Sequence, residues 1–111
     1  MKIFCDASGW NGIRSMIGLR KGKQNITVTF EDKFTVPKLE YFAIILASLV
    51  ADNEDEISSD SQLAVQQIKG EIKVSNIGLF PLAQAAKELI KWKVLKLDWI
   101  PRVQNKADKL I

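Results

Sequence analysis

The chain is organised around the stretch Ile3-Phe4-Cys5-Asp6-Ala7-Ser8-Gly9, in which three apolar residues lead into one carboxylate and then into small residues. A short apolar run that ends in turn-forming residues predicts a strand that is buried on both faces. We therefore expect Asp6 at the end of this strand, at the rim of a sheet. A carboxylate in that place needs a cation, a metal or hydrogen-bond donors. The alternative is that Asp6 begins an Asx-turn over the next residues.

The length and composition of the chain limit the class of protein. Its 111 residues, 47% of them hydrophobic and 26% charged, predict a single globular domain over residues 1–111. The N-terminus shows no signal-peptide pattern, and no apolar run reaches the ~18 residues that span a bilayer. Cys5 is the one cysteine, so no internal disulfide can form. These features favour a cytoplasmic, reducing location.

The charge of the chain and its lack of histidine restrict the chemistry that it can perform. There are 16 Lys and Arg residues against 13 Asp and Glu residues, a net charge of +3. This excess permits a polyanionic partner without requiring one. The absence of histidine excludes a Ser-His-Asp or Cys-His nucleophile and a His-ligated zinc site. Acid–base chemistry would have to come from carboxylates, lysine, metal-bound water or the substrate.

Hydrophobic periodicity and turn signals predict the remaining elements. Strands are expected at 14–19, 25–30, 57–59 and 94–100, with a hairpin turn at 20–23. Helices are expected at 37–51, 63–69 and 81–92, and the first turn of a further helix at 106–111. This order predicts an α/β fold with a five-stranded mixed sheet, an antiparallel meander followed by parallel strands, flanked by helices.

Four acidic residues stand at the boundaries of these elements: Asp6, Glu40, Asp60 and Asp108. The first and fourth strands are expected to be neighbours, so that their carboxyl ends bring Asp6 and Asp60 together. Clustered carboxylates repel one another, and ligation by carboxylates alone suits Mg²⁺ or Mn²⁺. Two such ions can hydrolyse a phosphodiester without a protein nucleophile. Taken singly, Glu40 is also explained by the helix dipole in a first helical turn, and Asp60 by N-capping of a helix.

Several other side chains have a structural and a functional interpretation. Trp10, Trp92 and Trp99 could stack on nucleotides, but the apolar elements around Trp92 and Trp99 favour the core for these two. Leu63 is expected to face inward, and 52–56 reads as a solvated acidic connector. A basic group lines either a phosphate track or a solvated face; its members are Lys87, Lys91, Lys93 and Lys96.

Five segments, in this order, resemble the motifs of the ribonuclease H family. Ile3–Ser8 is similar to its first strand with a D-x-S turn, and Leu39–Ala43 to its helix with an acid followed by apolar residues. Ile57–Leu63 carries an S-D-S-Q motif at the end of a strand. Trp99–Arg102 matches a W-x-P-R loop, and Asn105–Leu110 matches a closing N-x-A-D-x-L. The resemblance spans nearly the whole chain and fits the compact, archaeal-like form that lacks a basic protrusion.

This resemblance implies a metal-dependent endoribonuclease that hydrolyses the RNA strand of an RNA–DNA hybrid with two Mg²⁺ ions, or with Mn²⁺. It implies that Asp6 bridges both ions, that Asp108 completes the first ion's ligands, and that Glu40 and Asp60 complete the second's. The positions expected to contact the nucleic acid are Ser8, Asn11, Ser61, Gln62, Arg102 and Asn105.

The chain also departs from the family's pattern. Thr35-Val36-Pro37-Lys38 stands where the family often has asparagines, and no basic insertion follows Gly70. Asn105 lies three residues before Asp108, where four is usual, and Gln104 occupies the usual position. The chain ends three residues after Asp108, without the C-terminal helix that most members carry.

These departures leave two alternatives open: a catalytically weak nucleic-acid-binding domain of the same fold, and a piece of a larger polypeptide such as a reverse transcriptase. A junction resolvase of the same superfamily is disfavoured by the S-D-S-Q and W-x-P-R motifs. A monomer or weak dimer that does not associate with membranes is expected.

Overall fold

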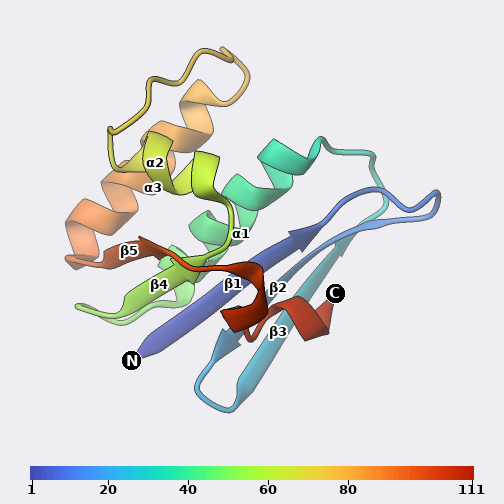
Figure 1. The fold of residues 1–111 in the computed structure, drawn as a ribbon, viewed down its shortest axis with the longest axis horizontal. Helices are drawn as coiled ribbons and strands as arrows, with labels where there is room; N and C mark the ends of the chain where they lie inside the picture. Colours follow the sequence, from blue (N-terminus) through green and yellow to red (C-terminus); the bar gives the residue numbers. More distant parts are fainter.

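The computed structural model describes residues 1–111 and contains one mixed sheet of five strands in the order β3-β2-β1-β4-β5 (Figure 1). The strands are β1 (Lys2–Ser8), β2 (Ser15–Lys21), β3 (Gln24–Phe30), β4 (Glu56–Ser59) and β5 (Lys96–Trp99). β1, β2 and β3 form an antiparallel meander, whereas β4 and β5 run parallel to β1. This is the sheet that the sequence predicts.

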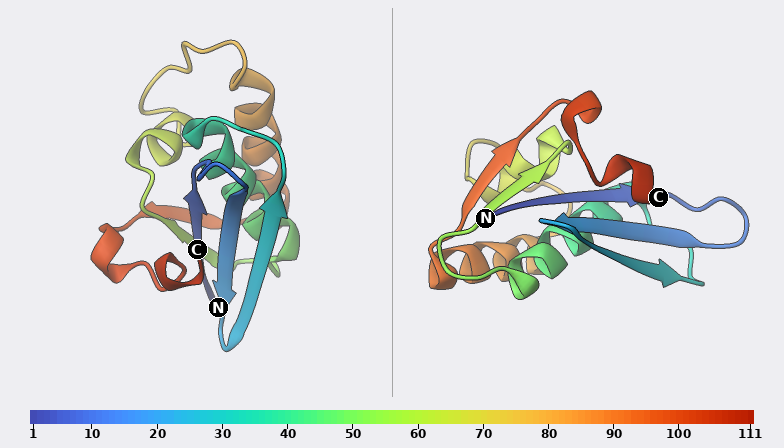
Figure 2. Two further views of the ribbon diagram at one scale, coloured as in Figure 1. Left: turned by 90° about the vertical axis from the view of Figure 1, so that its right-hand side faces the viewer. Right: turned by 90° about the horizontal axis from the view of Figure 1, so that it is seen from below.

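Three helices connect these strands: α1 (Val36–Val50), α2 (Gln62–Ile68) and α3 (Phe80–Lys93). α1 and α3 cover one face of the sheet, and the C-terminal segment crosses the opposite face (Figure 2). That segment contains two short 3₁₀ turns, Arg102–Gln104 and Asp108–Leu110, and the second contacts β1 and β2. None of the helices is both long and apolar enough to cross a membrane.

The core lies between the central strands and the helices. Because side chains alternate along a strand, Ile3 and Cys5 of β1 point into this core and are fully buried. Phe4 and Asp6 therefore point toward the face that the C-terminal segment crosses. The core of 19 buried residues also includes Ile17, Leu19, Leu39, Ile44, Ala47 and Ile57, all at most 2% exposed.

α1 is less buried than its nearly continuous apolar sequence predicts. Leu39 and Ile44 are buried, but Leu49 is 55% exposed. An open groove of about 290 Å³ with an entirely apolar lining runs between α1 and the outer strands, with Phe30 and Phe42 in its wall. The reason is that β3 is the edge of the sheet, so no further element covers this side of the helix.

Both tryptophans that were expected in the core are exposed. Trp92 is 75% exposed, because α3 packs through its opposite side, where Ala83 and Ala86 are buried. Trp99 is 45% exposed, since β5 is an edge strand, and its indole N–H donates to the Asp60 carbonyl at 3.2 Å. The expected inward position of Leu63 is also wrong, because this side chain is 47% exposed.

The acidic connector at 52–56 is not simply a solvated loop, because Asp55 is only 4% exposed. Its carboxylate accepts hydrogen bonds from the Met1 ammonium group and from the Asp52 N–H, both at 2.9 Å. The Lys21 ammonium lies 3.5 Å away. Asp55 thus belongs to a buried charge cluster at the start of β1.

Candidate metal centre

The carboxylates of Asp6 and Asp60 meet because of where the parallel pairing of β1 and β4 stops. The last parallel pair is Cys5 with Ser59, so Asp6 and Asp60 are each the first residue beyond it. β1 itself continues to Ser8 through its pairing with β2. The expectation that Asp6 ends its strand is therefore wrong. Asp6 instead directly follows the last parallel pair between β1 and β4.

Asp108 reaches the same place through the C-terminal segment. The buried amide of Asn105 donates to the Cys5 carbonyl at 2.9 Å and accepts from the Ala107 N–H at 3.0 Å. Beyond Asp108, the terminal residues pass over Gly18, the residue that pairs with Asp6 on β2. A Cβ at Gly18 would lie 3.0 Å from the Ile111 side chain and 3.2 Å from the Leu110 Cβ, so a larger residue here would require the terminal residues to shift.

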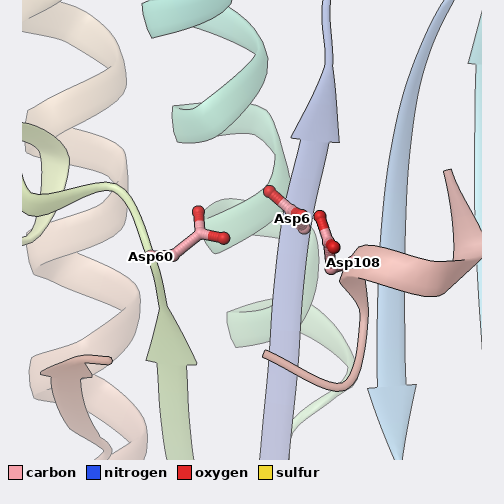
Figure 3. A group of neighbouring side chains, drawn as sticks. All are labelled: Asp6, Asp60 and Asp108. Carbon is pink, nitrogen blue, oxygen red and sulfur yellow. The ribbon is translucent and has the colours of Figure 1, made fainter. Parts of the chain in front are cut away.

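The three aspartates point toward one another (Figure 3), and each offers a carboxylate oxygen such that these oxygens lie within 4.8 Å of one another. One oxygen of Asp6 and one of Asp60 are buried without any hydrogen-bond partner. Buried carboxylate oxygens normally have donors or cations as partners. A site that offers only carboxylate oxygens, with unsatisfied acceptors aimed into it, fits Mg²⁺ or Mn²⁺.

The electrostatics of the cluster agree with this fit. The pKa of Asp6 is raised to about 7, and burial is the main cause. The hydrogen bond from the Ala7 N–H lowers this pKa, whereas the neighbouring carboxylates of Asp60 and Asp108 raise it further. A raised carboxyl pKa means that the protein without a cation favours a proton in this position. A divalent cation bound by these carboxylates would take the place of that proton and neutralise their negative charge.

Glu40 belongs to the wall of the same pocket but not to the close triad. It lines a cavity of about 240 Å³ together with Asp6 and Asp60. Burial raises the pKa of Glu40, a hydrogen bond from the Ser61 side chain lowers it, and the charge of Asp60 raises it. The helix begins at Val36, and its first turn contains no acidic residue. The dipole explanation of Glu40 is therefore wrong.

The geometry excludes the two structural roles considered for these acids, an Asx-turn for Asp6 and an N-cap for Asp60. Asp6 lies inside a strand, and its carboxylate accepts a hydrogen bond from the next residue, Ala7, at 2.8 Å, which is not an Asx-turn. The N-cap of α2 is Ser61, whose hydroxyl oxygen accepts from the Ala64 N–H at 3.3 Å. Asp60 is left with its carboxylate turned to the pocket.

The residues expected to contact nucleic acid divide into two groups. Gln62 is exposed at a cavity that it shares with Glu40 and Asp60, and Arg102 lines the carboxylate pocket. Ser8 is the last residue of β1. The Asn11 side chain accepts hydrogen bonds from the backbone N–H groups of Ile13 and Arg14 in its own loop. In the second group, Ser61 and Asn105 are buried and bonded within the protein, so their side chains position neighbouring groups and do not face a ligand.

Arg102 also supplies the only cation at this pocket. Its Nε donates to the Asp108 carboxylate at 3.2 Å, and both side chains are partly exposed. An exposed ion pair of this kind is weak. Asp108 can therefore exchange this partner for a more highly charged one.

The contributions of Gly18 and Asn105 to the site were not predicted. Asn105 was assigned to nucleic-acid contact on its motif alone, and Gly18 lies in a strand whose glycine gives no sign of what crosses it. A glycine inside a strand does signal close approach by another backbone or ligand. That signal could have indicated a segment crossing β2.

Comparison with known proteins supports the fold. No protein-family model matches the sequence. The N-terminal RNase H domain of a Mycobacterium tuberculosis protein, solved as a fusion with maltose-binding protein, matches with a TM-score of 0.82 at 23% identity, covering 98% of this chain and 88% of that one. RNase H1 from the archaeon Halobacterium salinarum matches with a TM-score of 0.81 at 21% identity, covering 98% and 91%.

A third similar structure is an RNase H1 isolated from compost by a metagenomic approach, solved with a bound RNA/DNA hybrid. It matches with a TM-score of 0.80 at 24% identity over 98% of this chain and 91% of that one. The resemblance inferred from the motifs is thus confirmed at the level of the architecture: the chain has the ribonuclease H-like fold.

Proposed function

We propose that this protein is a metal-dependent ribonuclease H, which hydrolyses the RNA strand of RNA–DNA hybrids. The observation that carries the proposal is the aspartate triad beside the point where the parallel pairing of β1 and β4 ends, with two buried oxygens that lack partners. The hybrid as substrate is supported by the similar RNase H1 that was solved with a bound RNA/DNA hybrid.

In this proposal, Asp6 holds the central position, because it lies between Asp60 and Asp108 (Figure 3). Asp6 and Asp108 would hold one divalent ion, and Asp6, Glu40 and Asp60 a second. The bound ions would supply the positive charge that activates water and stabilises the phosphoryl oxygens and the leaving group. The chain's own part is to keep the ligands in place: Ser61 orients Glu40, and Asn105 orients the segment that carries Asp108.

The experiment that tests this proposal is a gel assay with labelled RNA–DNA hybrid, double-stranded RNA and single-stranded RNA. Cleavage of the hybrid should stop with EDTA and return with Mg²⁺ or Mn²⁺. Asp60→Asn should abolish most of the cleavage, whereas Asp32→Asn, a matched change at an exposed acid outside the pocket, should not. Full cleavage in EDTA would exclude the metal mechanism.

The second candidate is a catalytically weak domain that binds the hybrid. It is favoured by the Arg102–Asp108 ion pair, which occupies one of the proposed ligands. The same assay separates the two candidates when binding is measured in Ca²⁺. A domain of the second kind binds the hybrid with no cleavage in Mg²⁺ or Mn²⁺, and Asp60→Asn leaves its behaviour unchanged.

A further inference from the structure

The largest cavity of the protein lies outside the carboxylate pocket. It is a groove of about 470 Å³ between the C-terminal end of α2, the second half of α3 and β5. These elements lie together at one side of the sheet (Figure 1). Four lysines line it, and we refer to it as the lysine groove: Lys69, Lys87, Lys91 and Lys96.

The lysine groove is a concentrated positive site on a chain of low net charge. Asp98 is the one acid in its lining. Lys69 is 3.9 Å from Asp98, and Lys96 is 3.9 Å from Glu56, which lies outside the groove. Exposed pairs at this distance contribute little. The groove thus keeps a net positive charge.

Lys87 and Lys91 form no ion pair at all. They are four residues apart on α3, so they lie on the same face of the helix, where like charges destabilise it. The helix dipole favours Lys91 in the last turn, but this effect does not extend to Lys87 in the middle of α3. A polyanion bound between them would remove the repulsion.

The neighbouring Lys93 shows what a structural lysine looks like in this protein. Its ammonium group donates to the carbonyls of Ser48, Leu49 and Ala51 at 2.8–2.9 Å and so caps the end of α1. Neither interpretation of this lysine from the sequence, phosphate track or solvated face, describes it. The lysines of the groove have no such partners, and they share its lining with apolar residues such as Ile90 and Leu97.

The groove adjoins the candidate metal centre through two elements. α2 begins two residues after Asp60 and ends at Ile68, next to Lys69, and its seven residues make it about 10 Å long at 1.5 Å per residue. β5 lines the groove with Asp98, and the next residue, Trp99, is bonded to the Asp60 carbonyl.

We infer that the lysine groove binds the phosphodiester backbone of the nucleic acid beyond the metal centre. The inference rests on the proposed function for the identity of the nucleic acid. The contacts are electrostatic and independent of sequence, since lysine ammonium groups read charge and not base identity. These contacts would extend the surface that binds the duplex beyond the carboxylate pocket.

The test compares two double variants that lose the same charge. Lys87→Gln with Lys91→Gln alters the groove, and Lys23→Gln with Lys33→Gln alters exposed, unpaired lysines at the opposite edge of the sheet. The affinity for a fluorescent RNA–DNA hybrid is measured by anisotropy in Ca²⁺ at increasing salt. Each lost phosphate contact lowers the slope of log K against log salt by about 1. We expect a loss of about 2 in slope for the groove variant and nearly none for the control variant.

Cleavage in Mg²⁺ is measured on the same proteins. The failure of the groove proposal can therefore be distinguished from the failure of the proposed function. An unchanged slope in the groove variant, or an equal loss of slope in both variants, would refute nucleic-acid binding by the groove. Cleavage of the hybrid in the same experiment would leave the ribonuclease assignment intact. A loss of about 2 confined to the groove variant supports the groove, even in a protein that does not cleave. The melting temperature of the groove variant should stay at or above that of the parent protein, since the repulsion between Lys87 and Lys91 is removed.

Discussion

Two buried carboxylates lie near the opposite ends of β1, and their electrostatic properties are opposite. Asp55, beside the start of β1, is 4% exposed, and Asp6, near its end, is 6% exposed. Burial raises the pKa of Asp55, but the Met1 ammonium, the Asp52 N–H and the charge of Lys21 lower it, and the net shift is downward. The pKa of Asp6 is raised to about 7 by burial and by the neighbouring acids.

The difference shows that burial alone does not say what a carboxylate does. Asp55 has a cation or a donor on each oxygen, so its charge stabilises the fold. Asp6 and Asp60 each have one buried oxygen with no partner, so their charges cost stability until a cation is supplied. The first arrangement is structural, and the second is that of a binding site.

The largest expected effect is on catalysis, at the Asp6 end of β1. Asp6→Asn removes one charge with little change of shape, and the lost stabilisation of the transition state is worth several kcal/mol. At ~1.4 kcal/mol per factor of ten, hybrid cleavage should fall at least about a hundredfold. Asp55→Asn should keep nearly full activity per folded molecule. Equal activity of Asp6→Asn and the parent protein would refute the assignment of the site.

The next effect is on stability, at the Asp55 end. Asp55→Asn leaves the Met1 ammonium and Lys21 without their buried partner, and hydrogen bonds to charged groups are worth about 2 kcal/mol. Urea unfolding should show this loss, with a fall in melting temperature of about 8 °C. Asp52→Asn is the matched control, since this side chain is 85% exposed. A variant as stable as the control would show that the Asp55 cluster is not structural.

A smaller effect is expected where the C-terminal segment is tied to β1. Asn105→Ala removes both hydrogen bonds of the buried amide, so Asp108 is no longer held beside Asp6. Hybrid cleavage should fall about tenfold, the loss of roughly 1.4 kcal/mol that one buried hydrogen-bonding group typically costs. Mn²⁺ titration followed by electron paramagnetic resonance should show weaker binding. Asn25→Ala, at an exposed position of β3, is the control. Unchanged Mn²⁺ affinity would mean that Asn105 supports only the fold.

The smallest effect concerns pH and the protein in EDTA. The folded pKa of Asp6, about 7, lies above the ordinary value of 3.8, so between these values the folded state holds a proton that the unfolded state has lost. Stability should therefore decline as the pH rises from about 6 to about 7, by about 1 kcal/mol, with Glu40 acting in the same direction. Urea unfolding at several pH values measures this slope. A slope that persists in Asp6→Asn and in Asp55→Asn alike would assign it to other groups.

Much of the architecture could be predicted from the sequence, because it depends on local patterns. Alternation and turn residues indicated β1, β2 and β3, and the apolar periodicity indicated α1 and α3 within one or two residues of their ends. The order of these elements predicted the mixed sheet. The convergence of Asp6 and Asp60 followed from the same order, since parallel neighbours end at the same edge.

Only the tertiary structure determined which groups each side chain contacts. Asp55 and Glu54 are adjacent in the sequence, yet Asp55 alone is buried against the N-terminus. Lys93 is separated from Lys91 by one residue, yet it caps α1, and Lys69 joins the groove from another helix. Periodicity reports which face of an element is apolar, whereas the group that meets a given side chain depends on contacts between elements far apart in the chain. For that reason the sequence indicated four candidate acids, and only the fold showed which oxygens lack a partner.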